Sequence, residues 1–215
     1  MDIKEKSIRR LRKQADGGDP QAQYKAAYYL ASRSNADRYR RQCVDLLKAS
    51  ATQGNRFAQY ALGNWYIHGI GVRKNYKAAY LYFLSSAKQE HALAQYNLGV
   101  SLEKGKGVQK NLTQAAKWYR KAAEHGDKNA QGELGRCYFY GIGVERNYQK
   151  AVFWYRTAAR KGNREAQYSL GYCYVKGLGV RPNKRLALLW YRKAAEQGYR
   201  DARIGVKQLV SELAQ

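Results

Sequence analysis

The sequence has few residues that bend or cross-link a chain, with two prolines and three cysteines among 215 residues. Pro20 and Pro182 each precede an expected helix or occupy its first turn, where proline is tolerated. No apolar run is long enough to span a bilayer, and Met1 to Arg10 has no apolar stretch after its basic residues. These absences argue against a membrane-spanning helix and a secretory signal. We therefore expect a cytoplasmic protein.

Acidic residues are also scarce relative to basic ones. The sequence has 16 Asp and Glu residues against 40 Lys and Arg residues, which gives a net charge of +24. The basic residues are distributed along the chain and do not form a tail. A surface of this charge favours acidic partners.

A pattern of small and apolar residues recurs with a fixed period of 94 − 58 = 36 residues. Its four copies begin at Ala58, Ala94, Ala130 and Ala166, and each opens with Ala-Gln-x-x-Leu-Gly. A period of this length indicates a stack of supersecondary units, none of which can bury its apolar face alone. The sequence therefore predicts a solenoid.

Each copy encodes two helices. The first has small or apolar residues four positions apart and stops at a Gly-x-Gly-Val turn, whose first glycine can adopt the left-handed conformation that closes a helix. An asparagine then opens the second helix by accepting from its free amides. The second helix carries a bulky aromatic pair and ends in small residues. The turn glycines are Gly69, Gly105, Gly141 and Gly177, and the capping asparagines are Asn75, Asn111, Asn147 and Asn183.

Two sets of residues in these columns are assigned to the core. Glycines beside the core leucine are predicted to let helices approach closely; they are Gly63, Gly99, Gly135 and Gly171. Tyrosines at helical spacing are predicted to pack inside; they are Tyr60, Tyr66, Tyr96, Tyr119, Tyr138, Tyr155, Tyr168, Tyr174 and Tyr191.

The repeat columns extend in weaker form toward both ends. Residues 20–57 form a degenerate copy, in which Arg33 to Ala36 replaces the Gly-x-Gly-Val turn. That turn should have a different shape and greater mobility. Residues 58–201 hold the four regular copies, while 1–19 and 202–215 are expected to form capping helices with polar outer faces. We expect one continuous solenoid domain.

The combination of Ala-x-x-x-Leu-Gly, Gly-x-Gly-Val, Ala-x-x-[Trp/Phe]-Tyr and Ala-Ala resembles the Sel-one-like repeat family, a longer relative of the tetratricopeptide repeat. The departures, such as Gly132 for an aromatic and Leu102 for tyrosine, affect single units. The resemblance implies an all-α, right-handed α-α superhelix that binds proteins and catalyses no reaction. It also makes a bacterial origin plausible, with roles as an adaptor or as the immunity partner of a toxin.

Cysteine usage agrees with a reducing compartment. Secreted members of the resembled family carry a cysteine pair in each repeat, and that pattern is absent here. Cys137 and Cys173 share one column of consecutive copies, so their helices should lie too far apart for a disulfide. We expect buried thiols.

No arrangement of residues predicts a catalytic, cofactor or metal site. The Gly-x-Gly segments follow helices and lack the third glycine of a dinucleotide fingerprint. His68, His91 and His125 fall in different columns without partners at ligand spacing. We therefore expect neither an enzyme nor a bound cofactor.

A row of positions on the first helices should face a concave groove and bind the partner. The row comprises Lys25, Tyr28, Asn64, His68, Asn97, Lys104, Arg136, Tyr140, Tyr172 and Lys176. The expected partner is an acidic protein or peptide, with a toxin or a secretion-associated effector as candidates.

Binding of RNA or DNA is the alternative, because phosphate contacts would explain the net charge directly. Basic residues on the second helices, such as Arg156 and Arg160, would then contribute as well. Against this alternative, aromatic residues do not alternate with basic ones as a base-stacking surface requires. The sequence leaves both the partner and the oligomeric state open.

Overall fold

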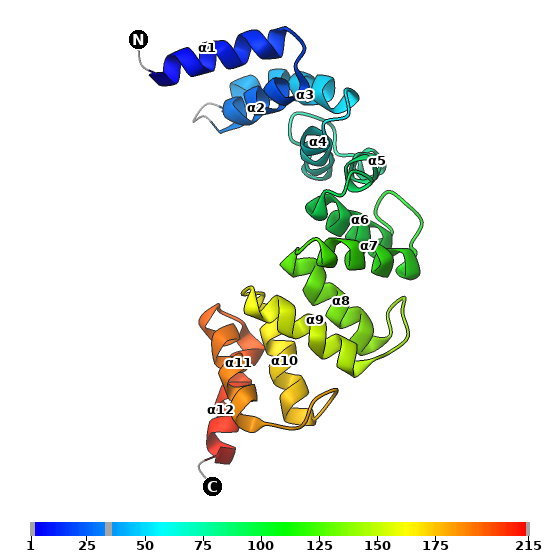
Figure 1. Ribbon diagram of the computed structural model, residues 1–215, viewed down its shortest axis with the longest axis vertical. Coiled ribbons are helices and arrows are strands. Elements are labelled where there is room, and N and C mark those ends of the chain that lie inside the picture. Colours follow the sequence, from blue (N-terminus) through cyan, green and yellow to red (C-terminus); the bar gives the residue numbers. More distant parts are fainter. Residues whose placement is uncertain (1–2, 33–35, 214–215) are drawn as a thin grey trace. The chain divides into compact units, whose positions relative to one another are not determined.

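The computed structural model describes residues 3–32 and 36–213, and all regular structure in these two ranges is helical (Figure 1). The first six helices are α1 (Ile3–Asp16), α2 (Pro20–Ala31), α3 (Ala36–Thr52), α4 (Arg56–His68), α5 (Tyr76–Ala87) and α6 (Ala92–Lys104). The next six are α7 (Leu112–Glu124), α8 (Lys128–Tyr140), α9 (Tyr148–Arg160), α10 (Arg164–Lys176), α11 (Lys184–Glu196) and α12 (Arg200–Leu213). The predicted helix pairs are confirmed.

The chain forms two compact units, Met1–Lys110 and Asn111–Gln215, here called unit 1 and unit 2. In unit 1, α2 packs against α3 and α4 against α5, and the pairs contact each other through α3 and α4. In unit 2, α8 packs against α9 and α10 against α11, with α12 against α11. Sequential packing of helix pairs confirms the all-α solenoid architecture. The continuity of the two units as one domain stays a prediction.

Helix ends follow the predicted capping residues. The side chains of Asn75, Asn111, Asn147 and Asn183 each accept a hydrogen bond from the amide three residues on, at 2.8–3.0 Å. At the other ends Gly69, Gly105, Gly141 and Gly177 adopt the left-handed conformation. Both predictions are confirmed. The predicted change of turn shape at Arg33 to Ala36 falls on residues 33–35, which lie outside the described residues.

In the four regular repeats the first helix contributes a buried leucine and a neighbouring buried glycine to the core. Leu62, Leu98, Leu134 and Leu170 are completely buried. A Cβ atom on Gly135 would lie 2.6 Å from the Tyr155 ring, and one on Gly171 would lie 2.6 Å from Tyr191. These glycines are therefore packing residues, as predicted.

The assignment of nine tyrosines to the core is correct for five of them. Tyr119, Tyr138, Tyr155, Tyr174 and Tyr191 are buried. The other four, Tyr60, Tyr66, Tyr96 and Tyr168, are only half-buried. For Tyr168 the reason is that its ring stacks on Tyr191 at 5.3 Å, so the buried tyrosine fills the interior and the second ring covers it.

A buried glutamine at the start of each first helix joins the elements in a way that the sequence analysis missed. Its Nε2 donates to a main-chain oxygen eight residues earlier, at the end of the preceding helix, as Gln59 does to Ala51 (3.1 Å) and Gln167 to Ala159 (3.1 Å). In three of the repeats its Oε1 accepts from a glutamine 30 residues later, as in the pair of Gln167 and Gln197 (2.8 Å).

The glutamine in α8 lacks the second of these two bonds. Gln131 donates to Ala123 O at 2.9 Å, but its Oε1 is buried without a hydrogen-bond partner among the described residues. The position 30 residues later is Lys161, whose Nζ donates instead to Gly126 O at 2.8 Å. A buried acceptor without a donor destabilises the fold.

Candidate protein-binding surface

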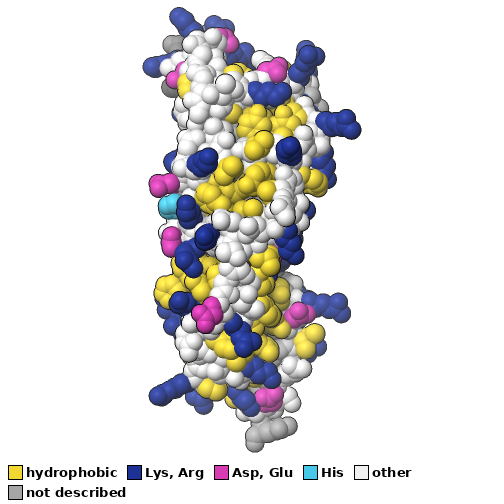
Figure 2. Space-filling view, turned by 90° about the vertical axis from the view of Figure 1, so that its right-hand side faces the viewer, with side chains coloured by type: hydrophobic (Ala, Val, Ile, Leu, Met, Phe, Trp, Pro, Cys, Tyr) yellow, Lys and Arg dark blue, Asp and Glu magenta, His cyan; other side chains and the backbone are white. Residues whose placement is uncertain are grey.

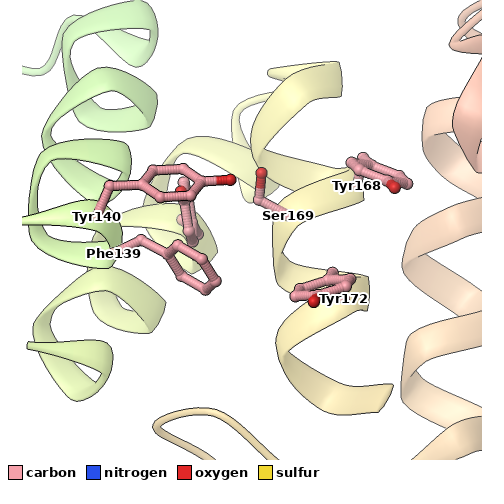
Figure 3. Close-up of a pocket in the computed structure, with 6 residues that line it drawn as sticks. Phe139, Tyr140, Tyr168, Ser169 and Tyr172 are labelled. Atoms are coloured by element: carbon pink, nitrogen blue, oxygen red, sulfur yellow. The ribbon is translucent and has the colours of Figure 1, made fainter. Parts of the chain in front are cut away.

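An aromatic cavity of about 270 Å³ opens in unit 2. It is lined by Phe139, Tyr140, Tyr155, Tyr168, Ser169 and Tyr172, here called the aromatic pocket. Figure 3 shows the Tyr140 side chain extending from α8 toward Ser169 on α10, with Tyr168 and Tyr172 also on α10. Three successive helices therefore build one pocket.

Phe139 lies among the rings of the aromatic pocket. Its ring centroid is 4.8 Å from that of Tyr140, and it is 6.2 Å from those of Tyr155 and Tyr172. Most of the rings meet edge to face or tilted, as aromatic pairs prefer. Tyr155 is buried at the base of the pocket, whereas Tyr140 and Tyr172 are 66% and 37% exposed. The pocket thus has a buried floor and accessible walls.

The hydroxyl groups of Tyr155 and Tyr168 in this pocket remain protonated at neutral pH. Burial raises the pKa of Tyr155, and a hydrogen bond with Ser169 opposes this only in part. Burial also raises the pKa of Tyr168, and the nearby Asp201 raises it further. Burial raises the pKa of the Cys173 thiol to about 12, so this group is no thiolate nucleophile. The site offers hydrogen-bond donors and apolar ring surface, which suit binding.

A second cavity of about 390 Å³ adjoins the first along α10, α11 and α12. Tyr168 and Tyr172 line both cavities, and Lys176, Asp201 and Glu212 line the second one only. Glu212 pairs with Lys184 at 2.8 Å. The second cavity therefore carries charges of both signs next to the aromatic pocket.

The structure brings together some of the predicted partner-binding residues of unit 2. Tyr140 and Tyr172 line the same pocket, and Lys176 lines the adjoining cavity with Tyr172. Arg136 is half-buried and pairs with Glu133 of its own helix, with Nε 2.6 Å from Oε2. Its guanidinium is therefore partly satisfied before any partner binds.

The predicted residues of unit 1 are also placed on first helices. Lys25, Tyr28, His68 and Lys104 are exposed, with Tyr28 at 70%. Asn64 and Asn97 are half-buried and hydrogen-bond to each other, with Asn97 Nδ2 3.4 Å from Asn64 Oδ1. Their participation in a groove that binds a partner stays a prediction.

Sequence reasoning left two residues of the aromatic pocket out of the predicted partner-binding set and assigned two others to the core. Phe139 and Ser169 were outside the predicted set, while Tyr155 and Tyr168 were treated as packing residues. The dense aromatic run Tyr138-Phe139-Tyr140 was the available signal. Because three successive aromatics on a helix point in different directions, at least one of them had to leave the core.

The described residues contain no group of three His, Cys, Asp or Glu side chains that could hold a metal ion. Within the same residues, no helix combines the length and the apolar character needed to cross a membrane. The thiols of Cys43, Cys137 and Cys173 are buried and not joined in disulfides, as predicted.

The Sel1 repeat family model matches the chain five times, at residues 20–55, 56–91, 92–127, 128–163 and 164–199. The chain therefore belongs to the Sel1 (Sel-one-like) repeat family, and the degenerate copy is one of its five repeats. No curated protein matches the chain significantly.

Solved structures with similar folds come from bacteria. A protective antigen of uropathogenic Escherichia coli with this repeat fold is 34% identical (TM-score 0.89), and the match covers 94% of this chain and 43% of the antigen. A Sel1 repeat protein of Oxalobacter formigenes is 35% identical (TM-score 0.76), covering 84% and 74% of the two chains. An immunity protein of Pseudomonas aeruginosa is 26% identical (TM-score 0.52), covering 85% and 67%. The chain thus spans less than half of the antigen.

Proposed function

We propose that this chain is a non-enzymatic protein-binding module of the cytoplasm, and that it holds an acidic protein or peptide. The observation that supports this proposal most strongly is the aromatic pocket, where Tyr140 and Tyr172 expose 66% and 37% of their surface around an open cavity. Tyrosine contributes a large rigid surface and a hydroxyl group, and it is enriched among the residues that dominate binding energy. We place the partner's anchoring side chain in this pocket.

The preference for an acidic partner is supported by the charge of the chain. With a net charge of +24, the protein attracts anionic surfaces and repels basic ones. On the face shown in Figure 2, Lys and Arg side chains are spread between hydrophobic patches, with fewer acidic ones. A partner with an apolar anchor and acidic surroundings would complement such a surface.

The partner class that we favour is a protein neutralised or recruited by this module, such as a toxin or a secretion-associated effector. Solved immunity proteins of Pseudomonas aeruginosa that are 26% identical support this choice. These immunity proteins share the repeat fold with this chain at a TM-score of 0.52. The partner itself is to be identified by experiment.

Affinity capture from the source cell, with and without nuclease and followed by mass spectrometry, identifies the partner. Titration of the purified partner against Tyr140→Ala should then show about 30-fold weaker binding, which corresponds to about 2 kcal/mol. Phe153→Ala is the matched control, because Phe153 is an aromatic of unit 2 that is 59% exposed and does not line the pocket. This control should change affinity less than twofold.

The same titrations test the alternative of nucleic-acid binding. A nucleic-acid ligand would lose affinity with each Lys or Arg removed, and log affinity would fall steeply with log salt. A capture that disappears with nuclease, together with equal binding by wild type and Tyr140→Ala, would overturn the protein-binding proposal.

A further inference from the structure

A larger cavity, of about 770 Å³, lies in unit 1 between α3 and the turn that follows α4. Five basic side chains line it, here called the basic basin, together with one carboxylate. These charged residues are Arg38, Arg40, Arg41, Lys48, Arg73 and Asp45. The basin is therefore the most cationic of the cavities described above, and the proposed partner pocket in unit 2 does not include it.

The basin arises where the degenerate repeat departs from the others. α3 has 17 residues and begins at Ala36, whereas α9 has 13 and begins at Tyr148, the residue equivalent to Arg40. The second helix is thus one turn longer at its start in the degenerate repeat. The added turn contributes Arg38 to the cavity.

The carbonyl of Arg40 in α3 also lies farther from the glycine turn of the next repeat than the equivalent carbonyls in regular repeats do. A Cβ atom on Gly143 would overlap the carbonyl of Leu112 in α7, and one on Gly179 would overlap that of Tyr148 in α9. At Gly71 the corresponding carbonyl of Arg40 would be 3.3 Å away. This looser contact leaves space for the basin.

An exchange of aromatic for basic residues increases the charge at the same place. In α5 and α9 the first residue is a tyrosine, and a neighbouring cation lies over its ring, with Lys74 5.0 Å from Tyr76 and Arg146 5.5 Å from Tyr148. In α3 the equivalent position is Arg40. Two cations, Arg38 and Arg40, therefore stand where the repeats of α5 and α9 have a cation and a ring.

The basic side chains follow one face of α3. Arg38, Arg41, Asp45 and Lys48 are three or four residues apart, which places them on the same side of the helix. Ten residues of helix extend about 15 Å, which matches four to five residues of an extended chain at about 3.3 Å each. The row therefore suits an elongated ligand with several negative charges.

We propose that the basic basin binds an acidic, extended peptide segment, whose Asp and Glu side chains pair with the arginines. Guanidinium groups bind carboxylates through two parallel hydrogen bonds, and four of the five cations are arginines. The inference rests on the proposed function in that the partner is a protein. It adds a second site, in a different unit, that recognises the negative charge of the partner.

Two features favour a peptide over a nucleic acid at this place. Asp45 interrupts the row of cations, and a carboxylate can accept from peptide N–H groups, whereas a phosphodiester backbone offers no such donor and is repelled. Tyr66, which lines the basin, already stacks on Tyr82 with ring centroids 5.6 Å apart. One face of this ring is therefore occupied and is lost as a platform for bases.

The test uses the full chain with a fluorescent polyglutamate peptide and a single-stranded DNA of equal charge as probes. The double variant R38A/R41A should weaken peptide binding about tenfold at low salt, since two charge-assisted contacts are lost. R185A/R192A in α11 removes the same charge from exposed positions outside the basin and should change binding less than twofold. Thermal melting of both variants checks that the fold is intact.

Asp45 separates the two ligand classes. Asp45→Asn should leave peptide binding within about threefold, because an amide oxygen still accepts from peptide N–H groups. Tighter binding of DNA than of peptide, with a further gain for Asp45→Asn, would overturn the peptide assignment in favour of nucleic acid. Equal losses for R38A/R41A and R185A/R192A would overturn the basin as a site.

The captured partner distinguishes this inference from the proposed function. If Tyr140→Ala weakens binding of the partner and R38A/R41A leaves that binding unchanged, the basin inference fails and the proposed function stands. If no protein partner binds at all but polyglutamate depends on Arg38 and Arg41, the proposed function fails and the basin remains an anion site.

Discussion

α3 and α9 occupy the same place in their repeats, yet they contact the following turn differently. α9 begins after the capping residue Asn147, and its first carbonyl lies against Gly179 so closely that a methyl group could not be added. Relative to α9, α3 begins four residues earlier in the repeat. Its Arg40 carbonyl would lie 3.3 Å from a Cβ atom on Gly71, which is farther than the equivalent carbonyl of α9 lies from Gly179. The comparison indicates that the turn of the regular repeat fixes where its second helix starts and how tightly it packs. Loss of that turn converts a packed junction into an open, charged one.

The largest difference between the two junctions should appear when a methyl group is added to the second turn glycine. Gly179 has φ +72°, and a Cβ there would overlap the Tyr148 carbonyl. Gly179→Ala should therefore destabilise the protein by about 3–5 kcal/mol, through backbone strain and overlap together. Gly71→Ala should cost about 1–2 kcal/mol, because the nearest backbone atom is 3.3 Å away and only a Val44 methyl must move. Urea denaturation measures both, and equal losses would show that the junctions are packed alike.

A smaller effect is expected inside a regular repeat. Gly135→Leu should destabilise the protein by about 1–3 kcal/mol, because any side chain there meets the buried Tyr155 ring. Gly132→Ala in the same helix is the control. Its Cβ would approach only the Asn163 side chain, at 3.3 Å, so a much smaller change is expected. An unchanged midpoint of denaturation for Gly135→Leu would contradict the packing role of this column.

The smallest predicted effect is a gain. Lys161→Gln supplies the side-chain amide that three other repeats use, as in the bond from Gln89 to Gln59 Oε1 at 2.9 Å. We expect up to about 1 kcal/mol of added stability, since a buried acceptor becomes paired. Lys161→Ala is the control, which loses the bond to Gly126 O without adding a donor to Gln131. Equal melting temperatures for the two variants would contradict this account.

The sequence predicts the repeat and the residues that cap its helices because these depend on local rules. Asn147 and Gly141 act within their own turn, so their roles follow from residue type and spacing. The aromatic pocket was predictable only in part. Tyr140 and Tyr172 belong to the predicted row, but Phe139 and Tyr168 depend on how rings from three helices share one space. Spacing along one helix does not contain that information.

The basic basin could not be predicted for a related reason. The sequence shows that Arg33 to Ala36 replaces a glycine turn, but it does not show where the next helix begins. That start decides whether Arg38 joins the row of α3 or belongs to a loop. The distance between the first turn of α3 and Gly71 likewise depends on packing between two repeats.

The buried glutamines have a consequence for how such an array can grow or shrink. The Oε1 of Gln167 holds its own repeat closed through Gln197, while its Nε2 ties that repeat to the preceding one through Ala159 O. One side chain thus supplies part of the intrinsic stability of a repeat and part of the coupling to its neighbour, the two quantities that describe a linear array with nearest-neighbour energies. A repeat could be duplicated or deleted as a block of 36 residues while both kinds of bond re-form. Each such change would alter the length of the binding surface without a new type of junction.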